Sequence, residues 1–294
     1  RSTVEIAQAP GAAGWGALVA SAGGSMQHQI ESAGARHIEM PLKGKNPIQI
    51  RKNAGRLAEL IAAERVDIIH ARSRAPAWSA LHAAQKTGCH FITTFHGAYG
   101  TSGSLKRRYN AVMTKGELVI ANSEFTANHI MHTYPMEQKN LRVIRRGVDI
   151  SIYNPGAVTQ ARVIQLAGQW RLPDGKSVIM LPGRLTAWKG HRVLLDALTH
   201  LTRDDYVVVF VGDEQGRAEY RHQLERQVEQ NDLGHIVRFA GPCRDMPAAY
   251  MSADVVVSAS TKPEAFGRVI VEGQAMGRPV VAFDHGGAKE TILG

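Results

Sequence analysis

The chain has 294 residues, of which 44% are hydrophobic and 21% charged, a composition typical of a globular α/β protein with about two domains. No apolar run approaches the ~18 residues of a membrane-spanning helix, and residues 1–11 lack the pattern of a secretory signal, so neither is predicted. The formal net charge of +9 comes from residues 1–150, which hold 19 Lys and Arg against 10 Asp and Glu, whereas residues 151–294 are neutral.

The uneven charge predicts that the first half of the chain meets an anionic partner. Nucleic acid, an anionic membrane surface and an acidic substrate all fit a basic surface, and so does a solvated surface that binds nothing. The two cysteines, Cys89 and Cys243, lie too far apart in the sequence to define a disulfide framework. We expect both to be free thiols in a reducing compartment.

Short β-branched runs alternate with helical stretches along the first half of the chain. Helices are predicted over Ile48–Glu64 and Ser123–Tyr134. The predicted strands of this half are Gly16–Ser21, Val66–His70, His90–Phe95, Leu118–Ala121 and Leu141–Ile144.

The alternation resumes after a turn cluster, Tyr153–Gly156, which lies in the predicted break between domains, Asp149–Gln169. The predicted elements of the second half are strands Ser177–Pro182, Tyr206–Val211, Ile236–Phe239, Val255–Ala259 and Pro279–Phe283, and helices His191–His200, Arg217–Asn231 and Val269–Met276. Apolar strands that alternate with helices indicate parallel sheets covered on both faces. We therefore predict two doubly wound α/β domains, residues 1–155 and 156–294.

Ligands of such domains bind at the carboxyl ends of the strands, and the segment Gly183–Gly190 follows one of them. It places Arg184 and Lys189 five residues apart on a turn between glycines, and the helix start beyond supplies free N–H groups. Arg makes forked contacts and Lys is a point charge, so the pair suits a diphosphate, although a solvated cationic loop fits the segment as well.

Two carboxylates, Glu264 and Glu272, lie eight residues apart behind the predicted strand Val255–Ala259. A helix is predicted to begin near Phe266 or Gly267, which leaves Glu264 in the loop and Glu272 one to two turns into the helix. The carboxylates then address opposite ends of a ligand whose anionic group lies at the helix start. A glycosidase pair and unrelated surface charges are the alternatives.

Three further segments follow strands or carry charge. The turn Gly286-Gly287 allows a phosphate or sugar to approach closely, a plain turn that binds no ligand being the alternative. His96 ends the strand His90–Phe95, where it suits a hydrogen bond to a sugar hydroxyl, a structural histidine being the alternative. The densest basic cluster, Lys106–Tyr109, suits anionic lipid head groups or acceptor phosphates, and otherwise a solvated helix face.

Several chemistries lack their motifs in this sequence. The histidines and cysteines form no zinc-binding pattern, and no D-x-D occurs, so no metal site is predicted. The sequence also lacks a Walker loop, a G-x-S-x-G elbow and a G-x-G-x-x-G fingerprint.

Taken in order, these segments resemble glycosyltransferase family 4, the large retaining group with the GT-B fold. The matching pieces are Gly183–Leu185 with Lys189-Gly190, Gly212-Asp213, Glu264–Gly267 with Glu272, Ala275–Ala282, Gly286-Gly287 with Glu290, and Val143–Asp149 with Tyr153–Pro155. The resemblance implies a metal-independent enzyme of two Rossmann-like domains that face a central cleft.

The resemblance also implies roles for the charged residues that match. Arg184 and Lys189 grip the donor diphosphate beside Gly183. Glu264 hydrogen-bonds the hydroxyls of the transferred sugar, and Glu272 binds the ribose hydroxyls.

The remaining matching residues line the same implied site. Phe266 and Gly267 offer backbone N–H groups to the sugar or the phosphates. Gly212 and Asp213 lie near the nucleotide base or ribose, and His96 faces the sugar ring from the other domain.

We therefore expect a retaining hexosyltransferase that moves a hexose from a UDP- or GDP-sugar to a glycan or glycolipid acceptor, as in cell-envelope polysaccharide or lipopolysaccharide synthesis, with no other cofactor. The N-terminal domain is expected to bind the acceptor and the C-terminal domain the donor. We expect a cytoplasmic protein with peripheral contact between residues 1–150 and an anionic inner membrane surface, and no nucleic-acid partner.

Other functions fit the same residues. A sugar-nucleotide epimerase or a phosphorylase of the same fold is one alternative, and a catalytically silent binding module is another. Compared with the family pattern, we expect the first strand and the C-terminal helices to be missing from the sequence.

Overall fold

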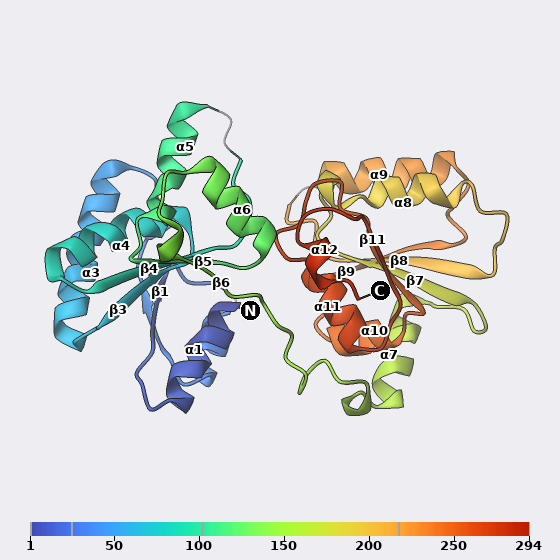
Figure 1. Cartoon of the computed structure of the whole chain (residues 1–294). Coiled ribbons are helices and arrows are strands. Elements are labelled where there is room, and N and C mark those ends of the chain that lie inside the picture. Colours follow the sequence, from blue (N-terminus) through green and yellow to red (C-terminus); the bar gives the residue numbers. More distant parts are fainter. Residues whose placement is uncertain (1, 25, 101–102, 217, 294) are drawn as a thin grey trace. The chain divides into compact units, whose positions relative to one another are not determined.

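The computed structural model describes residues 2–24, 26–100, 103–216 and 218–293, and it separates into two compact units (Figure 1). The units are Arg1–Ala121 with Ala127–Val143, and Asn122–Thr126 with Ile144–Gly294. This division falls earlier in the chain than the predicted boundary after residue 155. The reason is that Tyr153 is buried in the core of the second unit, where its ring centroid lies 6.1 Å from that of Tyr250.

A five-stranded parallel sheet forms the centre of the second unit, with the order β11-β10-β7-β8-β9. Its strands are β7 (Ser177–Pro182), β8 (Tyr206–Val211), β9 (Val237–Gly241), β10 (Val255–Ser258) and β11 (Val280–Ala282). All four pairings are parallel, as crossover helices require. The prediction of a doubly wound α/β domain is thereby confirmed for this unit.

Helices cover both faces of this sheet (Figure 1). On one face lie α7 (Gln160–Trp170), α10 (Met246–Met251) and α11 (Arg268–Ala275), and on the other lie α8 (His191–Leu198) and α9 (Ala218–Gln230). A short helix, α12 (Ala288–Thr291), follows the last strand.

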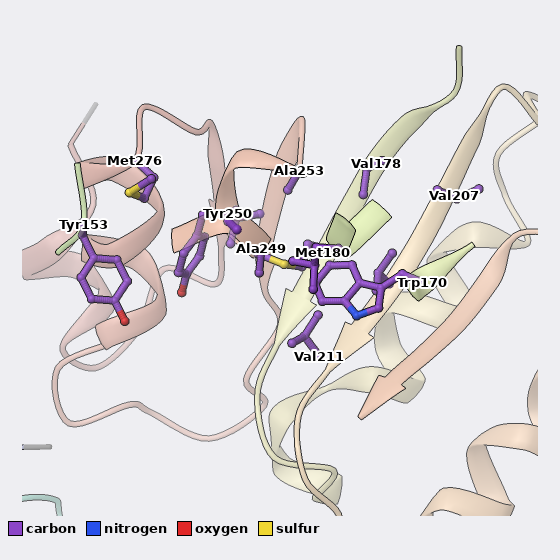
Figure 2. Packing of buried hydrophobic residues seen from close by; sticks show 14 residues of the cluster. Tyr153, Trp170, Val178, Met180, Val207, Val211, Ala249, Tyr250, Ala253 and Met276 are labelled. Atoms are coloured by element: carbon purple, nitrogen blue, oxygen red, sulfur yellow. The ribbon is translucent and has the colours of Figure 1, made fainter. Parts of the chain in front are cut away.

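The central strand β8 shows how the sequence builds this core. All six of its side chains are buried. Because successive side chains of a strand point to opposite faces, Val207, Val209 and Val211 pack with α7 and α10, and the alternate residues pack with α8 and α9. Figure 2 shows Val207 and Val211 in the first of these clusters with Trp170 and Met180.

The first unit contains a four-stranded parallel sheet, with its strands in chain order, and a separate parallel pair. The four strands are β3 (Ile68–Ala71), β4 (His90–Phe95), β5 (Leu118–Ala121) and β6 (Leu141–Val143). The pair consists of β1 (Leu18–Ser21) and β2 (Arg36–Glu39). Among the described residues, no ladder joins the pair to the larger sheet.

Six α-helices accompany these strands in the part of the first unit that is described: α1 (Ser2–Ala12), α2 (Gln27–Ser32), α3 (Pro47–Glu64), α4 (Arg74–Thr87), α5 (Ser104–Asn110) and α6 (Glu124–Thr133), whose first three residues belong to the second unit. The longest, α3, begins where local chemistry favours it. The side chain of Asn46 caps the helix by accepting a hydrogen bond from the Ile48 amide at 2.9 Å, and Pro47 occupies the first turn, where no N–H is needed.

The predicted strands all appear, with ends shifted by zero to two residues. The sequence R-H-I-E of β2 is too polar for a strand prediction, and α7 overlaps the segment predicted as the break between domains. Cys89 and Cys243 are free, as expected. No helix among the described residues combines the length and the apolar character that a membrane crossing needs.

Candidate active site

In the second unit, the strands that follow β7 are added to the sheet first on one side of β7 and then on the other. From β7 the chain proceeds to β8 and β9 on one side, and it returns to β10 and β11 on the other side. Such a switch point between neighbouring strands is where open α/β sheets bind ligands. The segments after β7, β8 and β10 contain nine of the ten predicted site residues.

The turn after β7 is built on two glycines that approach neighbouring backbone. Gly190 has φ +76°, and a Cβ at this position would lie 1.7 Å from the carbonyl oxygen of Ala259, at the end of β10. A Cβ on Gly212 would lie 1.9 Å from the carbonyl oxygen of Gly183. Only glycine fits at these two contacts, and the contacts bring the turns after β7, β8 and β10 together.

Lys189 and Glu264 form an ion pair across this junction. Their side chains are only 14% and 15% exposed, respectively. The Lys189 ammonium also lies 4.5 Å from the ring centroid of Trp188, a cation–π distance. The structure thus brings together two of the predicted site residues, one from each side of the switch point.

Glu264 is held in place through both its side chain and its backbone. The buried hydroxyl of Ser260 donates to Oε1 of Glu264 at 2.6 Å. The carbonyl oxygen of Glu264 accepts a hydrogen bond from the Gly287 amide at 2.8 Å. Cβ atoms on Gly286 and Gly287 would lie 2.7 and 2.6 Å from the carbonyl oxygens of Glu264 and Ala265. The glycine turn therefore packs against the carboxylate loop, which explains its composition without a ligand.

The helix α11 starts directly behind Glu264. Gly267 caps it with φ +85°, and Phe266 anchors the turn with 4% of its surface exposed. The first N–H groups of a helix have no partner within the helix and carry the positive end of its dipole. The start of α11 therefore adds a positive potential next to Lys189 and Glu264.

Glu272 lies inside α11 and is nearly buried, with a side chain that is 7% exposed. Its Oε2 accepts a hydrogen bond from the Tyr250 hydroxyl at 2.9 Å, and its Oε1 lies 3.3 Å from Nε of Arg268. Sequence reasoning did not identify Ser260 or Tyr250, because no local pattern links a hydroxyl to a carboxylate that packing brings to it. The predicted contact between Glu272 and a ribose stays a prediction.

A hollow of about 150 Å³ lies after β8 and β9. Gly212 and Asp213 line it, together with Leu185, Arg221 and Phe239. A second hollow of about 360 Å³ lies between α8 and α9 and is lined by polar side chains of these helices rather than by strand ends. The first hollow is the one beside the predicted site residues.

Arg184 projects from the same end of the sheet as this hollow. Its Nη1 donates to the side-chain oxygen Oε1 of Gln215 at 3.3 Å, and the backbone N–H of Gln215 donates to Oδ1 of Asp213 at 2.8 Å. The cation therefore stands beside the loop after β8. Its predicted contact with a diphosphate stays a prediction.

His191 lies directly beneath the Lys189 turn and is fully buried. Burial, together with the nearby charge of Lys189, lowers the pKa of its imidazole from 6.5 to about 4. The ring packs edge-on against Phe210, with centroids 5.1 Å apart. His191 is therefore a neutral support of the turn at physiological pH.

His96 follows β4 in the first unit and is half-buried. It belongs to a different compact unit from the other nine predicted residues. Its predicted approach to the sugar ring, and the central cleft that this implies, stay predictions. No group of three or more potential metal ligands occurs among the described residues.

Comparison with known proteins relates this arrangement to glycosyltransferases. Residues 1–152 match the family model described as Glycosyltransferase Family 4, and residues 164–293 match the model described as Glycosyl transferases group 1. The D-inositol 3-phosphate glycosyltransferase of Jonesia denitrificans is 30% identical over 187 residues, which are 62% of this chain and 44% of that protein. The chain thus spans less than half the length of this curated relative.

Two crystal structures are similar over 99% of the chain. A glycosyltransferase from Rickettsia africae has 37% identity and a TM-score of 0.90, with 77% of its own chain covered. HepE from Anabaena, in complex with UDP and glucose, has 25% identity and a TM-score of 0.86, with 79% covered. Since one family model spans more than half of the sequence and a second spans most of the rest, the chain belongs to glycosyltransferase family 4 and has the GT-B fold.

Proposed function

We propose that the protein transfers a hexose from a UDP- or GDP-sugar to a glycan or glycolipid acceptor with retention of anomeric configuration. The observation that carries the proposal is the contact between Lys189 and Glu264 at the start of α11. It unites a cation suited to a diphosphate with a carboxylate suited to sugar hydroxyls.

The proposed donor site divides the chemistry among these residues. Bond cleavage leaves negative charge on the diphosphate, which Arg184, Lys189 and the amides of Phe266 and Gly267 stabilise as it develops. The carboxylate of Glu264 orients the sugar by accepting hydrogen bonds from its hydroxyls. The cations neutralise the diphosphate without a divalent metal, so we propose a metal-independent reaction.

The nucleoside end of the donor belongs, on this proposal, at the hollow beside Gly212 and Asp213, with Glu272 on the ribose. The structure of HepE with bound UDP-glucose supports a uridine nucleotide sugar as the donor of this chain. The acceptor is assigned to the first unit, whose basic character suits an anionic glycolipid or lipopolysaccharide precursor.

Retention requires the acceptor hydroxyl to attack from the face that the diphosphate leaves. A departing diphosphate oxygen takes the acceptor proton, so no protein nucleophile is needed. His96 is proposed to stabilise the sugar from the first unit, and domain closure to exclude water that would hydrolyse the donor.

Donor binding is tested by the melting temperature of the protein with UDP-glucose, UDP alone and a GDP-hexose. We expect one of the sugar nucleotides to raise it, and Glu264→Ala to lose more of the response to the sugar nucleotide than of the response to UDP. Nuclear magnetic resonance of the product with a glycolipid acceptor then reports the anomeric configuration, with and without a metal chelator. An undiminished transfer rate in Glu264→Ala would refute its role, and an inverted product would refute retention.

A further inference from the structure

Two stretches of the first unit contain no acidic residue. They are residues 40–58, which include the start of α3, and residues 68–116, which include α4 and α5. The basic residues at the start of α3 and along α5 are exposed. The excess positive charge of the first half of the chain is therefore concentrated in these two stretches, where no acidic residue offsets it.

The helix α4 brings the start of α3 and α5 together. Nε1 of Trp78 donates to the carbonyl oxygen of Tyr109 at 3.2 Å, and Oγ of the adjacent Ser79 donates to the carbonyl oxygen of Ile50 at 3.1 Å. The ammonium of Lys45 lies 6.0 Å from the ring centroid of Tyr109, which joins the α3 start to α5 directly. Residues about 60 positions apart in the sequence thus share one surface.

This surface also exposes aliphatic side chains. Ile48, at the start of α3, is 79% exposed, and Leu105, at the start of α5, is 82% exposed. They are the two most exposed large apolar residues among those described in the first unit. We define the α3–α5 surface as Lys45, Ile48, Leu105, Lys106, Arg107 and Arg108.

The cations of the α3–α5 surface lack the neutralising partners that other basic residues of the unit have. Arg36 pairs with Glu64, and Lys139 pairs with Glu137. By contrast, none of the four cations of the α3–α5 surface forms an ion pair with a described acidic side chain. Their positive charge is therefore not neutralised by a described acidic side chain and can attract an anionic partner.

We propose that the α3–α5 surface docks on an anionic membrane. Lys and Arg are attracted to acidic head groups and place their charge at the level of the phosphates, while Ile48 and Leu105 enter the boundary with the acyl chains. The combination is less suited to nucleic acid, since single strands stack on exposed aromatic rings. The ring of Tyr109 is engaged by Trp78, with centroids 6.4 Å apart, and the two exposed apolar residues of the α3–α5 surface, Ile48 and Leu105, are aliphatic.

The test uses the whole chain and sedimentation with vesicles of phosphatidylcholine alone or with roughly one third phosphatidylglycerol. Each Lys or Arg near such a surface strengthens binding about fivefold, so Lys106→Gln/Arg107→Gln/Arg108→Gln is expected to weaken binding by roughly 100-fold. The matched control, Arg65→Gln/Lys86→Gln/Lys115→Gln, removes the same charge from exposed positions at the opposite end of the sheet. We expect it to change binding less than about threefold.

A second pair of variants isolates the apolar contribution. Leu105→Ser and Ile48→Ser are expected to weaken binding several-fold each at unchanged net charge, because the aliphatic contact is lost. The proposal is overturned if the control triple variant loses as much binding as the α5 triple variant, if vesicles without phosphatidylglycerol bind equally well, or if only oligonucleotides bind. The response of the melting temperature to UDP-glucose is measured on every variant, and it is expected to stay at the parent value because none of the substituted residues belongs to the proposed donor site.

Discussion

Replacing Lys189 by Met leaves Glu264 as a nearly buried carboxylate without its cation. The two side chains are 14% and 15% exposed, so water screens their interaction only weakly. Removal of one partner from a buried ion pair destabilises a protein by about 3–5 kcal/mol. Ser260 continues to donate to Glu264, which favours the lower end, about 3 kcal/mol.

A loss of this size is readily measured. The second unit is of a size at which each kcal/mol lowers the melting temperature by roughly 2–4 °C, so Lys189→Met is expected to lower it by roughly 6–12 °C. Glu264→Gln removes the charge of the other partner and leaves Lys189 unpaired. The double variant Lys189→Met/Glu264→Gln buries no isolated charge and is expected to lie within about 1 kcal/mol of the parent.

Thermal and urea denaturation of the four proteins complete this double-mutant cycle. The expected signature is a double variant more stable than Lys189→Met alone. If the effects of the two single variants simply add, the side chains do not interact in the folded protein, and the proposed function loses the contact that carries it. Transfer activity is expected to fall by about 100-fold or more in every variant, whatever its stability.

Three further changes probe the supports of the site. Tyr250→Phe removes the hydroxyl that donates to Oε2 of the buried Glu272 carboxylate and is expected to cost about 1–3 kcal/mol; an unchanged urea midpoint would contradict this support. Gly190→Ala places a methyl group against the carbonyl oxygen of Ala259 and is expected to prevent soluble expression, whereas a well-folded variant would show that the turn can move. Burial lowers the pKa of His191 from 6.5 to about 4 in the folded state, so the unfolded chain binds more protons between these pH values. The free energy of unfolding is therefore expected to fall by about 1.4 kcal/mol per pH unit as the pH drops from 6.5 toward 4, and urea titrations of His191→Phe should lack this part of the pH dependence.

Much of the fold could be predicted from hydrophobic pattern. A strand such as Tyr206–Val211 is apolar at every position, which is characteristic of a parallel strand buried on both faces. The strand Arg36–Glu39 escapes prediction because two of its four residues are charged and it pairs with a single neighbour. The domain boundary depends on tertiary packing, since the turn cluster joins the second unit through the burial of Tyr153 in its core.

The site could be predicted to the extent that it follows strand ends. The approach of Lys189 to Glu264 is a consequence of strand order, which places β10 beside β7 although β8 and β9 intervene in the sequence. The hydroxyls of Ser260 and Tyr250 were not predicted, since serine and tyrosine near carboxylates are common in any sequence. These hydroxyls matter because the carboxylates are buried, and a hydrogen bond to a buried carboxylate contributes more to stability than one at the surface.

If the proposed function is right, the ion pair between Lys189 and Glu264 affects how the donor binds. A diphosphate that draws Lys189 toward itself removes the cation from Glu264, so a nucleoside diphosphate alone leaves that carboxylate with Ser260 as its remaining described partner. A donor that also carries a sugar supplies hydroxyl groups to the same carboxylate and restores its hydrogen bonds. The two ends of the donor are then coupled through one side chain, and the site favours an intact nucleotide sugar over its product by more than the sugar contacts alone would provide.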